Sequence, residues 1–310
     1  MQSSLLTIGT RGSPLALYQA HLVQRMICEA SGHTLEQVAI KILKTSGDTI
    51  KGELKDFGGK GLFTRELELA LLDGSIDMAV HSMKDVPTVG HEDLRVSAIL
   101  PRTDVRDAFI SVKYNSIAEL PRGALIGSAS LRRRAQLAVL RPDLTFCLLR
   151  GNVGTRLKKL EAGVCDATML ACAGLRRLEQ DERITEAVET DVMLPAPAQG
   201  AIGIEIRKER EDLKAVLEPL NDPAAQLETT AERAFLRALD GNCRTPIAAL
   251  ARWDGKQLAL KGEILAKDGS LRIAQEVTGD VATSAEAYDL GLKLGEAVRT
   301  ETAGRITFDD

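Results

Sequence analysis

The chain has 310 residues, of which 44% are hydrophobic, 27% charged and 3% aromatic, with a net charge of −4. This length suits two or three domains with sizeable cores, and no apolar run approaches the ~18 residues that a membrane helix needs. The few aromatic side chains leave little material for stacking nucleic-acid bases. The N-terminal residues lack the basic and long apolar regions of a secretion signal, so we expect a cytoplasmic protein that binds neither membranes nor nucleic acid.

Positive charge is concentrated in the middle of the chain. Residues 102–177 contain 14 lysines and arginines but 6 aspartates and glutamates, and the rest of the chain has a net charge of −12. A basic region inside an acidic chain indicates a local site for anions rather than a surface for nucleic acid.

The five cysteines are odd in number, and no two of them have the Cys-x-x-Cys spacing. This argues against a disulfide framework and against a structural zinc site. No two of the four histidines are separated by one helical turn, which gives a histidine metal site little support. We therefore expect reduced thiols and no metal.

The first hundred residues alternate strands with helices, as in an α/β fold. Apolar periodicity predicts strands at 5–9, 38–43, 76–80 and 95–100, and helices at 14–27 and 63–72. Ser13 suits the N-cap of the first helix, and Pro14 suits its first turn. Residues 45–61 form a long glycine-rich loop that is typical of a functional segment, but they lack the GxxxxGK[ST] pattern of a nucleotide site.

The remaining residues predict two further domains. The expected elements are strands at 108–112, 125–127, 145–149, 167–171 and 201–206, a helix at 223–239, strands at 247–253, 257–265 and 271–277, and a helix at 285–298. A proline-rich connector at 195–200 precedes the strand at 201–206, and this strand returns to the first lobe in our prediction.

We therefore predict an α/β fold of two lobes around a cleft, plus a small C-terminal α+β domain. The first lobe is discontinuous and comprises residues 1–101 plus 195–219. The second lobe is arginine-rich and comprises residues 102–194. The C-terminal domain comprises residues 220–310.

Two charged residues follow the buried strand predicted at 76–80. Because ligands bind beyond the carboxyl ends of strands in open α/β sheets, Lys84 and Asp85 are candidates for a ligand site. Pro87 cannot continue a strand and keeps Val86 extended, which fixes the loop. The alternative is an exposed lysine–aspartate turn without a function.

Arginines follow three successive strands of the second lobe. They are, in chain order, Arg132 with Arg133, Arg150 with Arg156, and Arg177. Ser130 can cap the first of the helices, where cations are unfavourable unless an anion offsets them. The planar arginine fork binds carboxylates and phosphates through two hydrogen bonds. Since there is no nucleotide motif, a polycarboxylate ligand is favoured, and a solvated basic helix face is the alternative.

One cysteine lies in a turn-rich loop. Cys243 is next to Arg244, whose charge lowers the thiol pKa and favours the reactive thiolate. Cys147, Cys165 and Cys172 lie in or beside predicted buried strands, where cysteine is usually inert packing. An incidental loop cysteine is the alternative to a functional one.

Six segments together resemble the motifs of the porphobilinogen deaminases, also called hydroxymethylbilane synthases. The segments are Arg11–Leu17, Gly58–Phe63, Ala79–Pro87, Ser130–Arg133, Leu149–Arg156 and Gly241–Ile247. The match runs through nearly the whole chain in order. The part beyond Ile247 is the least distinctive.

The resemblance implies a transferase of tetrapyrrole and haem biosynthesis. Four porphobilinogen molecules are joined head to tail with release of ammonia, and linear hydroxymethylbilane is then released by hydrolysis. A dipyrromethane cofactor, attached to Cys243 through a thioether, is the primer. The resemblance also implies a cytoplasmic monomer that passes its product to uroporphyrinogen-III synthase.

The resemblance assigns roles to residues. Asp85 is the catalytic group, which assists loss of the aminomethyl nitrogen and stabilises the cationic azafulvene. The residues expected to hold the cofactor are Lys84, Asp85, Ser128, Ser130, Arg132 and Arg133. The residues expected to hold substrate and growing chain are Arg11, Ser13, Gln19, Lys60, Arg150, Arg156, Arg177 and Gln199. The loop ending at Lys60 is expected to act as a lid.

Two residues depart from the family pattern. Ala198 stands before Gln199 where many relatives show glycine, and Asn242 precedes Cys243 where glycine or serine is commoner. Neither change removes a reactive group. The alternative function is a non-catalytic two-lobed protein that binds a polycarboxylate and carries no covalent cofactor.

Overall fold

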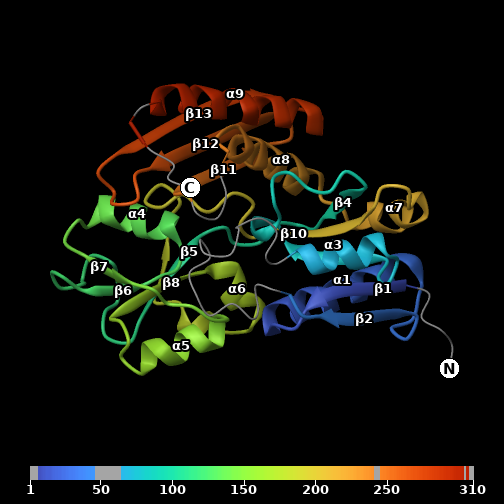
Figure 1. Ribbon diagram of the computed structural model, residues 1–310, viewed down its shortest axis with the longest axis horizontal. Helices are drawn as coiled ribbons and strands as arrows, with labels where there is room; N and C mark the ends of the chain where they lie inside the picture. Colours follow the sequence, from blue (N-terminus) through green and yellow to red (C-terminus); the bar gives the residue numbers. More distant parts are fainter. Residues whose placement is uncertain (1–5, 46–63, 241–244, 304, 307–310) are drawn as a thin grey trace. The chain divides into compact units, whose positions relative to one another are not determined.

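The computed structural model describes residues 6–45, 64–240, 245–303 and 305–306. They form an α/β structure with two five-stranded sheets and one three-stranded sheet (Figure 1). Residues 1–103 with 201–226 make one compact unit, and residues 104–200 with 227–310 make the other. The division into three domains stays a prediction. No helix in the described part of the chain is long and apolar enough to cross a membrane.

The first unit contains a mixed sheet in the order β2-β1-β3-β10-β4. Its strands are β1 (Leu6–Arg11), β2 (Val38–Leu43), β3 (Met78–Ser82), β4 (Leu94–Ile99) and β10 (Ile202–Arg207). Strand β1 runs parallel to β2 and β3, whereas β10 is antiparallel to β3 and β4. The predicted return of the strand after the connector is therefore confirmed.

Helices pack against this sheet. They are α1 (Pro14–Ser31), α3 (Arg65–Leu72) and α7 (Glu211–Leu217), with 3-10 turns η2 (Met83–Asp85) and η4 (Glu218–Leu220). The Ser13 hydroxyl accepts a hydrogen bond from the N–H of Ala16, which confirms the predicted N-cap of α1. Gly32 ends the helix with φ of 73°. Ile8 and Val23 are fully buried in the core between α1 and the sheet.

The second unit repeats this strand arrangement in the order β7-β6-β8-β5-β9. Its strands are β5 (Asp107–Ser111), β6 (Leu125–Gly127), β7 (Thr145–Cys147), β8 (Ala167–Ala171) and β9 (Glu186–Val188). Its helices are α4 (Leu131–Leu140), α5 (Val153–Glu161), α6 (Cys172–Arg177) and the 3-10 turn η3 (Asp181–Arg183). Strand β6 is parallel to β7 and β8, and β5 is antiparallel to β8 and β9. Each five-stranded sheet thus has its antiparallel strand in fourth place.

The same unit contains the three-stranded antiparallel sheet of the C-terminal region. Its strands are β11 (Ile247–Trp253), β12 (Gln257–Leu265) and β13 (Arg272–Asp280), and its helices are α8 (Pro223–Ala238) and α9 (Ser284–Thr302). Helix α9 lies along β12 and β13 (Figure 1). A Cβ atom at Gly291 would lie 2.2 Å from the carbonyl oxygen of Ala231, so glycine is needed where α9 crosses α8.

Candidate functional site

The predicted arginine residues follow three neighbouring parallel strands of the second unit. Strand β6 lies between β7 and β8 and is parallel to both, so the carboxyl ends of all three strands meet at one edge of the sheet. Arg132 and Arg133 follow β6, Arg150 and Arg156 follow β7, and Arg177 follows β8. The sheet therefore gathers cations that are up to 45 residues apart in sequence.

A carboxylate that the sequence did not single out lies among these arginines. Asp107 starts β5 beside the end of β8, because the two strands are antiparallel and Asp107 pairs with Ala171. Its side chain is fully buried. Asp107 Oδ2 accepts from Arg132 Nη1 at 2.7 Å, and Oδ1 accepts from Arg133 Nη2 at 2.6 Å and Nε at 3.1 Å.

The two guanidinium groups keep Asp107 ionised. Burial by itself would raise the pKa of the carboxyl group, but the charges and hydrogen bonds of Arg132 and Arg133 outweigh burial and lower it far below its usual range. Arg132 is 5% exposed and Arg133 6% exposed, so water screens these ion pairs little. Two cations face one anion, which leaves a positive surplus at this place.

Further buried bonds link Arg132 to the C-terminal sheet. Its Nη1 also donates to Gln136 Oε1 and to the carbonyl of Leu194, both at 2.8 Å. Gln136 Nε2 in turn donates to Glu263 Oε1 at 2.6 Å. Glu263 is fully buried on β12 and is paired with Arg272 at 2.6 Å. Helix α4, which contains Arg132 and Arg133, is thus linked to β12 by a chain of hydrogen bonds between side chains.

The two predicted serines shape the turn between β6 and α4. Ser128 Oγ accepts from the N–H of Ser130 at 3.1 Å, and Ser130 Oγ accepts from the N–H of Arg133 at 3.4 Å. Ser130 is therefore the N-cap of α4, as expected. The hydroxyl hydrogens are donors that these bonds leave available.

The other arginines of this edge differ in burial. Arg150 and Arg156 are half-buried, and Arg156 Nε donates to the carbonyl of Gly151 at 2.8 Å. Arg177 is buried in α6, and its Nη2 donates to the carbonyl of Gly200 at 2.7 Å. Arg177 therefore supports the connector that precedes β10.

The predicted Gln199 lies on this connector and also contacts Asp107. Its Nε2 donates to Asp107 Oδ1 at 3.0 Å and to the carbonyl of Val105 at 2.7 Å. Ala198 before it has φ of 60°, the left-handed region that glycine adopts most easily. The buried carboxylate of Glu232 holds this turn, because it accepts from the N–H of Ala198 at 2.6 Å.

In the first unit, the predicted lysine and aspartate lie in the 3-10 turn after β3. The strand extends to Ser82, two residues past the expected end, because β10 pairs with His81 and Ser82. Asp85 ends the turn and is half-buried. Among the described residues, no group donates a hydrogen bond to its carboxylate. Asp85 therefore keeps its acceptor sites for a ligand, whereas Asp107 does not.

Side chains from α1 and β10 support this turn. Gln19, predicted to bind substrate, is buried and donates through Nε2 to Ser82 Oγ at 2.8 Å. His81 Nε2 lies 3.1 Å from Glu205 Oε2 on β10, and both residues are buried. Arg11 ends β1, the parallel neighbour of β3, so it lies at the same sheet edge as Asp85. Of the site residues predicted in this unit, the structure thus brings Arg11 and Gln19 to the sheet edge at which Lys84 and Asp85 lie.

Two predicted residues, Lys60 and Cys243, lie outside the described residues. Among the described residues, no group of histidine, cysteine, aspartate and glutamate is arranged to hold a metal ion.

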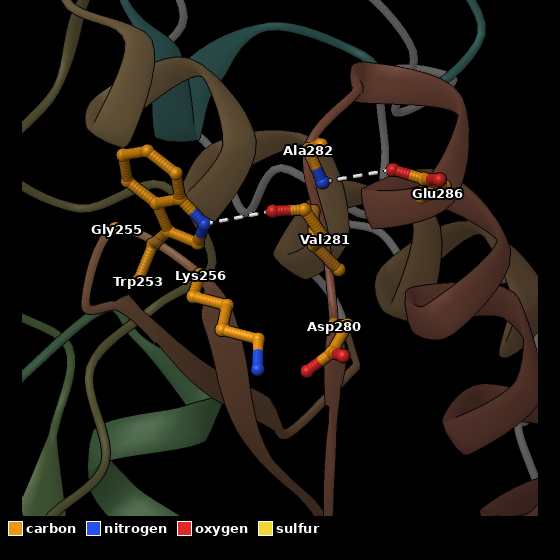
Figure 2. Close-up of a pocket in the computed structure, with 7 residues that line it drawn as sticks. All are labelled: Trp253, Gly255, Lys256, Asp280, Val281, Ala282 and Glu286. Carbon is orange, nitrogen blue, oxygen red and sulfur yellow. Dashed lines mark hydrogen bonds between the residues drawn. The ribbon is translucent and has the colours of Figure 1, made fainter.

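A hollow of about 300 Å³ on the C-terminal sheet contains none of the predicted residues (Figure 2). It is lined by Trp253, Gly255, Lys256, Asp280, Val281, Ala282 and Glu286. Trp253 Nε1 donates to the carbonyl of Val281 at 2.9 Å, and Glu286 accepts from the N–H of Ala282 at 2.8 Å (Figure 2). These bonds hold the connection between β13 and α9. The polar groups of Trp253 and Glu286 thus have a structural role, and we assign the hollow no function.

The fold and the site define an α/β protein in which arginines gather at the carboxyl ends of three parallel strands, an arrangement suited to an anion. Residues 6–215 match the family model described as porphobilinogen deaminase, dipyromethane cofactor binding domain, and residues 226–300 match the model of the porphobilinogen deaminase C-terminal domain. The chain belongs to the porphobilinogen deaminase family.

Curated relatives agree with this assignment over almost the full length. The porphobilinogen deaminase of Paracoccus denitrificans is 52% identical over 295 residues, which cover 95% of this chain and 93% of the relative. The protein of the same name from Nitrobacter winogradskyi is 48% identical, with 98% and 100% of the two chains covered. Among solved structures, a periplasmic substrate-binding protein from Coxiella burnetii is similar with a TM-score of 0.44 and 16% identity, covering 71% of this chain and 93% of the other.

Proposed function

We propose that Asp85 is the catalytic group and Cys243 the point of cofactor attachment in the reaction of this family. The chain is an enzyme that joins porphobilinogen units into hydroxymethylbilane for tetrapyrrole synthesis, with release of ammonia. The observation that supports the site assignment best is the arginine residues at the carboxyl ends of β6, β7 and β8. Each pyrrole unit has an acetate and a propionate group, so a growing chain requires many cations.

The family cofactor is dipyrromethane, which supplies a covalent primer with a free pyrrole position. The donors of the second unit fit such a group, because two buried guanidiniums face one carboxylate and leave positive charge for a ligand. We assign the cofactor carboxylates to Lys84, Ser128, Ser130, Arg132 and Arg133, with Asp85 at the pyrrole nitrogens.

The proposed role of Asp85 is electrostatic stabilisation of a positively charged intermediate. Loss of neutral ammonia from the protonated aminomethyl group of porphobilinogen leaves a cationic substrate, and a carboxylate that accepts from the pyrrole N–H stabilises this cation. The support is its position after β3 and the absence of a hydrogen-bond donor to it among the described residues.

The remaining predicted residues are assigned to the carboxylates of substrate and growing chain. They are Arg11, Ser13, Gln19, Lys60, Arg150, Arg156, Arg177 and Gln199. Gln19, Arg177 and Gln199 also have structural bonds, so their neutral variants should affect stability as well as binding. We further propose a cytoplasmic monomer of three domains that delivers its product to uroporphyrinogen-III synthase.

Intact mass spectrometry tests the proposal. The wild-type protein should carry the extra mass of dipyrromethane and gain further pyrrole units when porphobilinogen is added. Cys243→Ser should lack the extra mass, whereas Cys28→Ser, a matched change of another cysteine, should keep it. If Cys243→Ser still carried the cofactor, the attachment site would be wrong.

The same spectra separate the enzyme from the alternative of a non-catalytic polycarboxylate-binding protein. A binding protein would have the mass of the bare chain and would release no ammonia. A bare wild-type chain that gains no mass with porphobilinogen would contradict the proposed function.

A further inference from the structure

We propose that Asp107 is a positioning residue for the cofactor: its carboxylate accepts from Nη1 of Arg132 and from Nε and Nη2 of Arg133, and so helps to select which N–H groups the two arginines present to a carboxylate of the ligand. This inference rests on the proposed role of the two arginines in holding cofactor carboxylates. Asp107 itself is fully buried and is assigned no contact with the cofactor.

Arg132 is held at one end only. Its Nη1 donates to Asp107 Oδ2, to Gln136 Oε1 and to the carbonyl of Leu194, at 2.7–2.8 Å. Among the described residues, its Nε and Nη2 donate to no group. These two nitrogens form the side edge of the guanidinium, which binds a carboxylate through two parallel hydrogen bonds. The contacts of Nη1 therefore leave Arg132 with a complete edge for a ligand.

Arg133 is held in the opposite way. Its side edge is occupied, because Nε and Nη2 both donate to Asp107 Oδ1. Its Nη1 donates once, to the carbonyl of Met169 at 2.8 Å. A guanidinium has five N–H donors, so one N–H on each of Nη1 and Nη2 remains for a ligand. Asp107 thus occupies a different part of each guanidinium, and a different edge of each arginine remains for a ligand.

Asp107 is itself held from a third direction. Gln199 Nε2 donates to Oδ1 at 3.0 Å, and this amide is fixed by the carbonyl of Val105. Every bond to the carboxylate comes from a buried group, so the carboxylate has little freedom to move. A ligand carboxylate would meet guanidiniums that are already oriented, which reduces the ordering entropy of binding.

The alternative is that Asp107 is a buried ion pair with a purely structural role. Asp104 provides a matched control for this alternative. Its side chain is 7% exposed, and it also bonds two arginines, Arg106 at 3.0 Å and Arg176 at 3.1 Å. Neither of these arginines is assigned to the cofactor. Both aspartates therefore have similar structural roles, but only one orients arginines of the site.

The experiment compares Asp107→Asn, Asp107→Glu and Asp104→Asn. For each variant, thermal unfolding reports stability, and intact mass reports the fraction that carries the cofactor and the rate at which the bare fraction acquires it from porphobilinogen. Asparagine places an N–H₂ group against one of the two guanidiniums, so it cannot hold both. Glutamate keeps the charge but moves the carboxylate by one methylene.

We expect both asparagine variants to unfold at lower temperature and only Asp107→Asn to acquire the cofactor slowly. Loss of one charge-assisted bond of the positioned arginines should slow acquisition at least about tenfold. Asp107→Glu should be more stable than Asp107→Asn and should acquire the cofactor at a rate between Asp107→Asn and wild type. This variant keeps the test decisive if Asp107→Asn does not fold.

The positioning role of Asp107 and the assignment of the two arginines to the cofactor are tested by different results. If Asp107→Asn, or in its absence Asp107→Glu, acquired the cofactor as fast as Asp104→Asn, Asp107 would have a structural role alone. If Arg132→Gln and Arg133→Gln also acquired it at the wild-type rate, the assignment of these arginines to the cofactor would be wrong as well. Slow acquisition in the arginine variants together with normal acquisition in both Asp107 variants would reject the positioning role only.

Discussion

Asp85 and Asp107 have opposite surroundings, and this difference separates their roles. Asp107 receives hydrogen bonds from two arginines and a glutamine, whereas no described group donates to Asp85. A carboxylate saturated by the protein can orient its partners but has little capacity left for a substrate. A half-buried carboxylate with available oxygens can stabilise a cation that appears only during the reaction.

Removal of the Asp85 charge should therefore reduce turnover more than displacement of that charge. We expect Asp85→Asn to lower kcat about 10²–10³-fold, the usual effect of losing one electrostatic contact of a transition state. Asp85→Glu should keep part of the activity and should still carry the cofactor. Asp77→Asn is a control, because Asp77 in the same unit pairs with Arg210 at 2.8 Å. Turnover of Asp85→Asn within about threefold of wild type would exclude the role.

Two of the described cysteines, Cys165 and Cys172, are poor nucleophiles. Burial raises the pKa of the Cys165 thiol to about 11 and that of Cys172 to about 12. Both thiols are buried and should remain protonated at neutral pH, and only the thiolate reacts.

We therefore expect Cys165 and Cys172 to resist iodoacetamide at pH 8 in the native protein and to react fully in denaturant. Peptide mass spectrometry of the labelled protein gives the modified fraction of each cysteine. Rapid native labelling of either residue would contradict the burial that the structure assigns to it.

At the scale of elements, local apolar patterns predict the strands that have clear boundaries. The strands at 38–43, 125–127, 167–171, 247–253 and 257–265 have the predicted bounds. Strand β9 was missed because its two apolar residues, Ala187 and Val188, lie between Glu186 and Glu189. Strand β3 extends through Ser82 because it pairs with β10, in which Gly203, the partner of His81, is 122 residues away in sequence. Local sequence contains no signal for such partners.

For the site, the sequence likewise indicated residues that follow a strand but not contacts between residues distant in sequence. The positions of Arg132, Arg150 and Arg177 after successive strands indicate an anion site, since ligands in open α/β sheets bind beyond the carboxyl ends of the strands. The contacts of Asp107, and with them its proposed role, were not predictable, because its partners are 25, 26 and 92 residues away. An acidic residue at the start of an apolar strand was the one available signal.

Ala198 gives a prediction about the connector. An L-residue with a Cβ atom in the left-handed region is strained by about 1–2 kcal/mol, and Ala198 has φ of 60°. Ala198→Gly relieves this strain but increases the entropy of the unfolded chain, so we expect a net stabilisation of about 0.5–1 kcal/mol. Urea unfolding gives the value.

Ala196→Gly is the matched control, because Ala196 is two residues away and is not among the described residues with positive φ. Without strain to relieve, this change should destabilise the protein by about 0.5–1 kcal/mol. The same sign for both variants would contradict the strain at Ala198.

At the scale of the molecule, the carboxylates of the second unit predict sensitivity to acid. Asp104 and Asp107 have pKa values below those of an unfolded chain, because arginine bonds outweigh the effect of burial on each. Their contribution to stability is complete above the unfolded pKa of about 3.9 and is lost as pH falls below it.

The free energy of unfolding should therefore fall from about pH 4 downward more steeply in the wild type than in Asp107→Asn. The variant lacks one of the groups that must bind a proton on unfolding, although it is less stable at neutral pH. Urea unfolding at several pH values measures both slopes. Parallel slopes would mean that Asp107 is not ionised in the folded protein.

The second unit also predicts a cooperative link between its two sheets. Gln136 on α4 donates to Glu263 on β12 at 2.6 Å and to the carbonyl of Leu194 at 2.9 Å, and all these groups are buried. The N–H of Ala249 on β11 donates to the carbonyl of Pro195 at 3.1 Å. Opening of the C-terminal sheet should therefore also break the bond that joins Gln136 on α4 to Glu263 on β12.

Gln136→Met should weaken this link, because a thioether of similar length cannot bond the buried oxygens of Glu263 and Leu194. We expect a loss of about 1–3 kcal/mol for the unpaired groups, and faster hydrogen exchange in both α4 and β12. Gln275→Met is the control, since Gln275 lies on β13 of the same sheet and makes an exposed bond to Glu301 of α9. Loss of this bond should change stability by less than about 0.5 kcal/mol. Mass spectrometry of peptides from α4 and β12 measures the exchange rate of each segment. The link would be contradicted if Gln136→Met accelerated exchange in one segment without the other. It would also be contradicted if Gln136→Met accelerated exchange no more than Gln275→Met does. Equal acceleration in both segments would mean that helix α4, with the arginines assigned to the cofactor, opens together with the sheet of the C-terminal region.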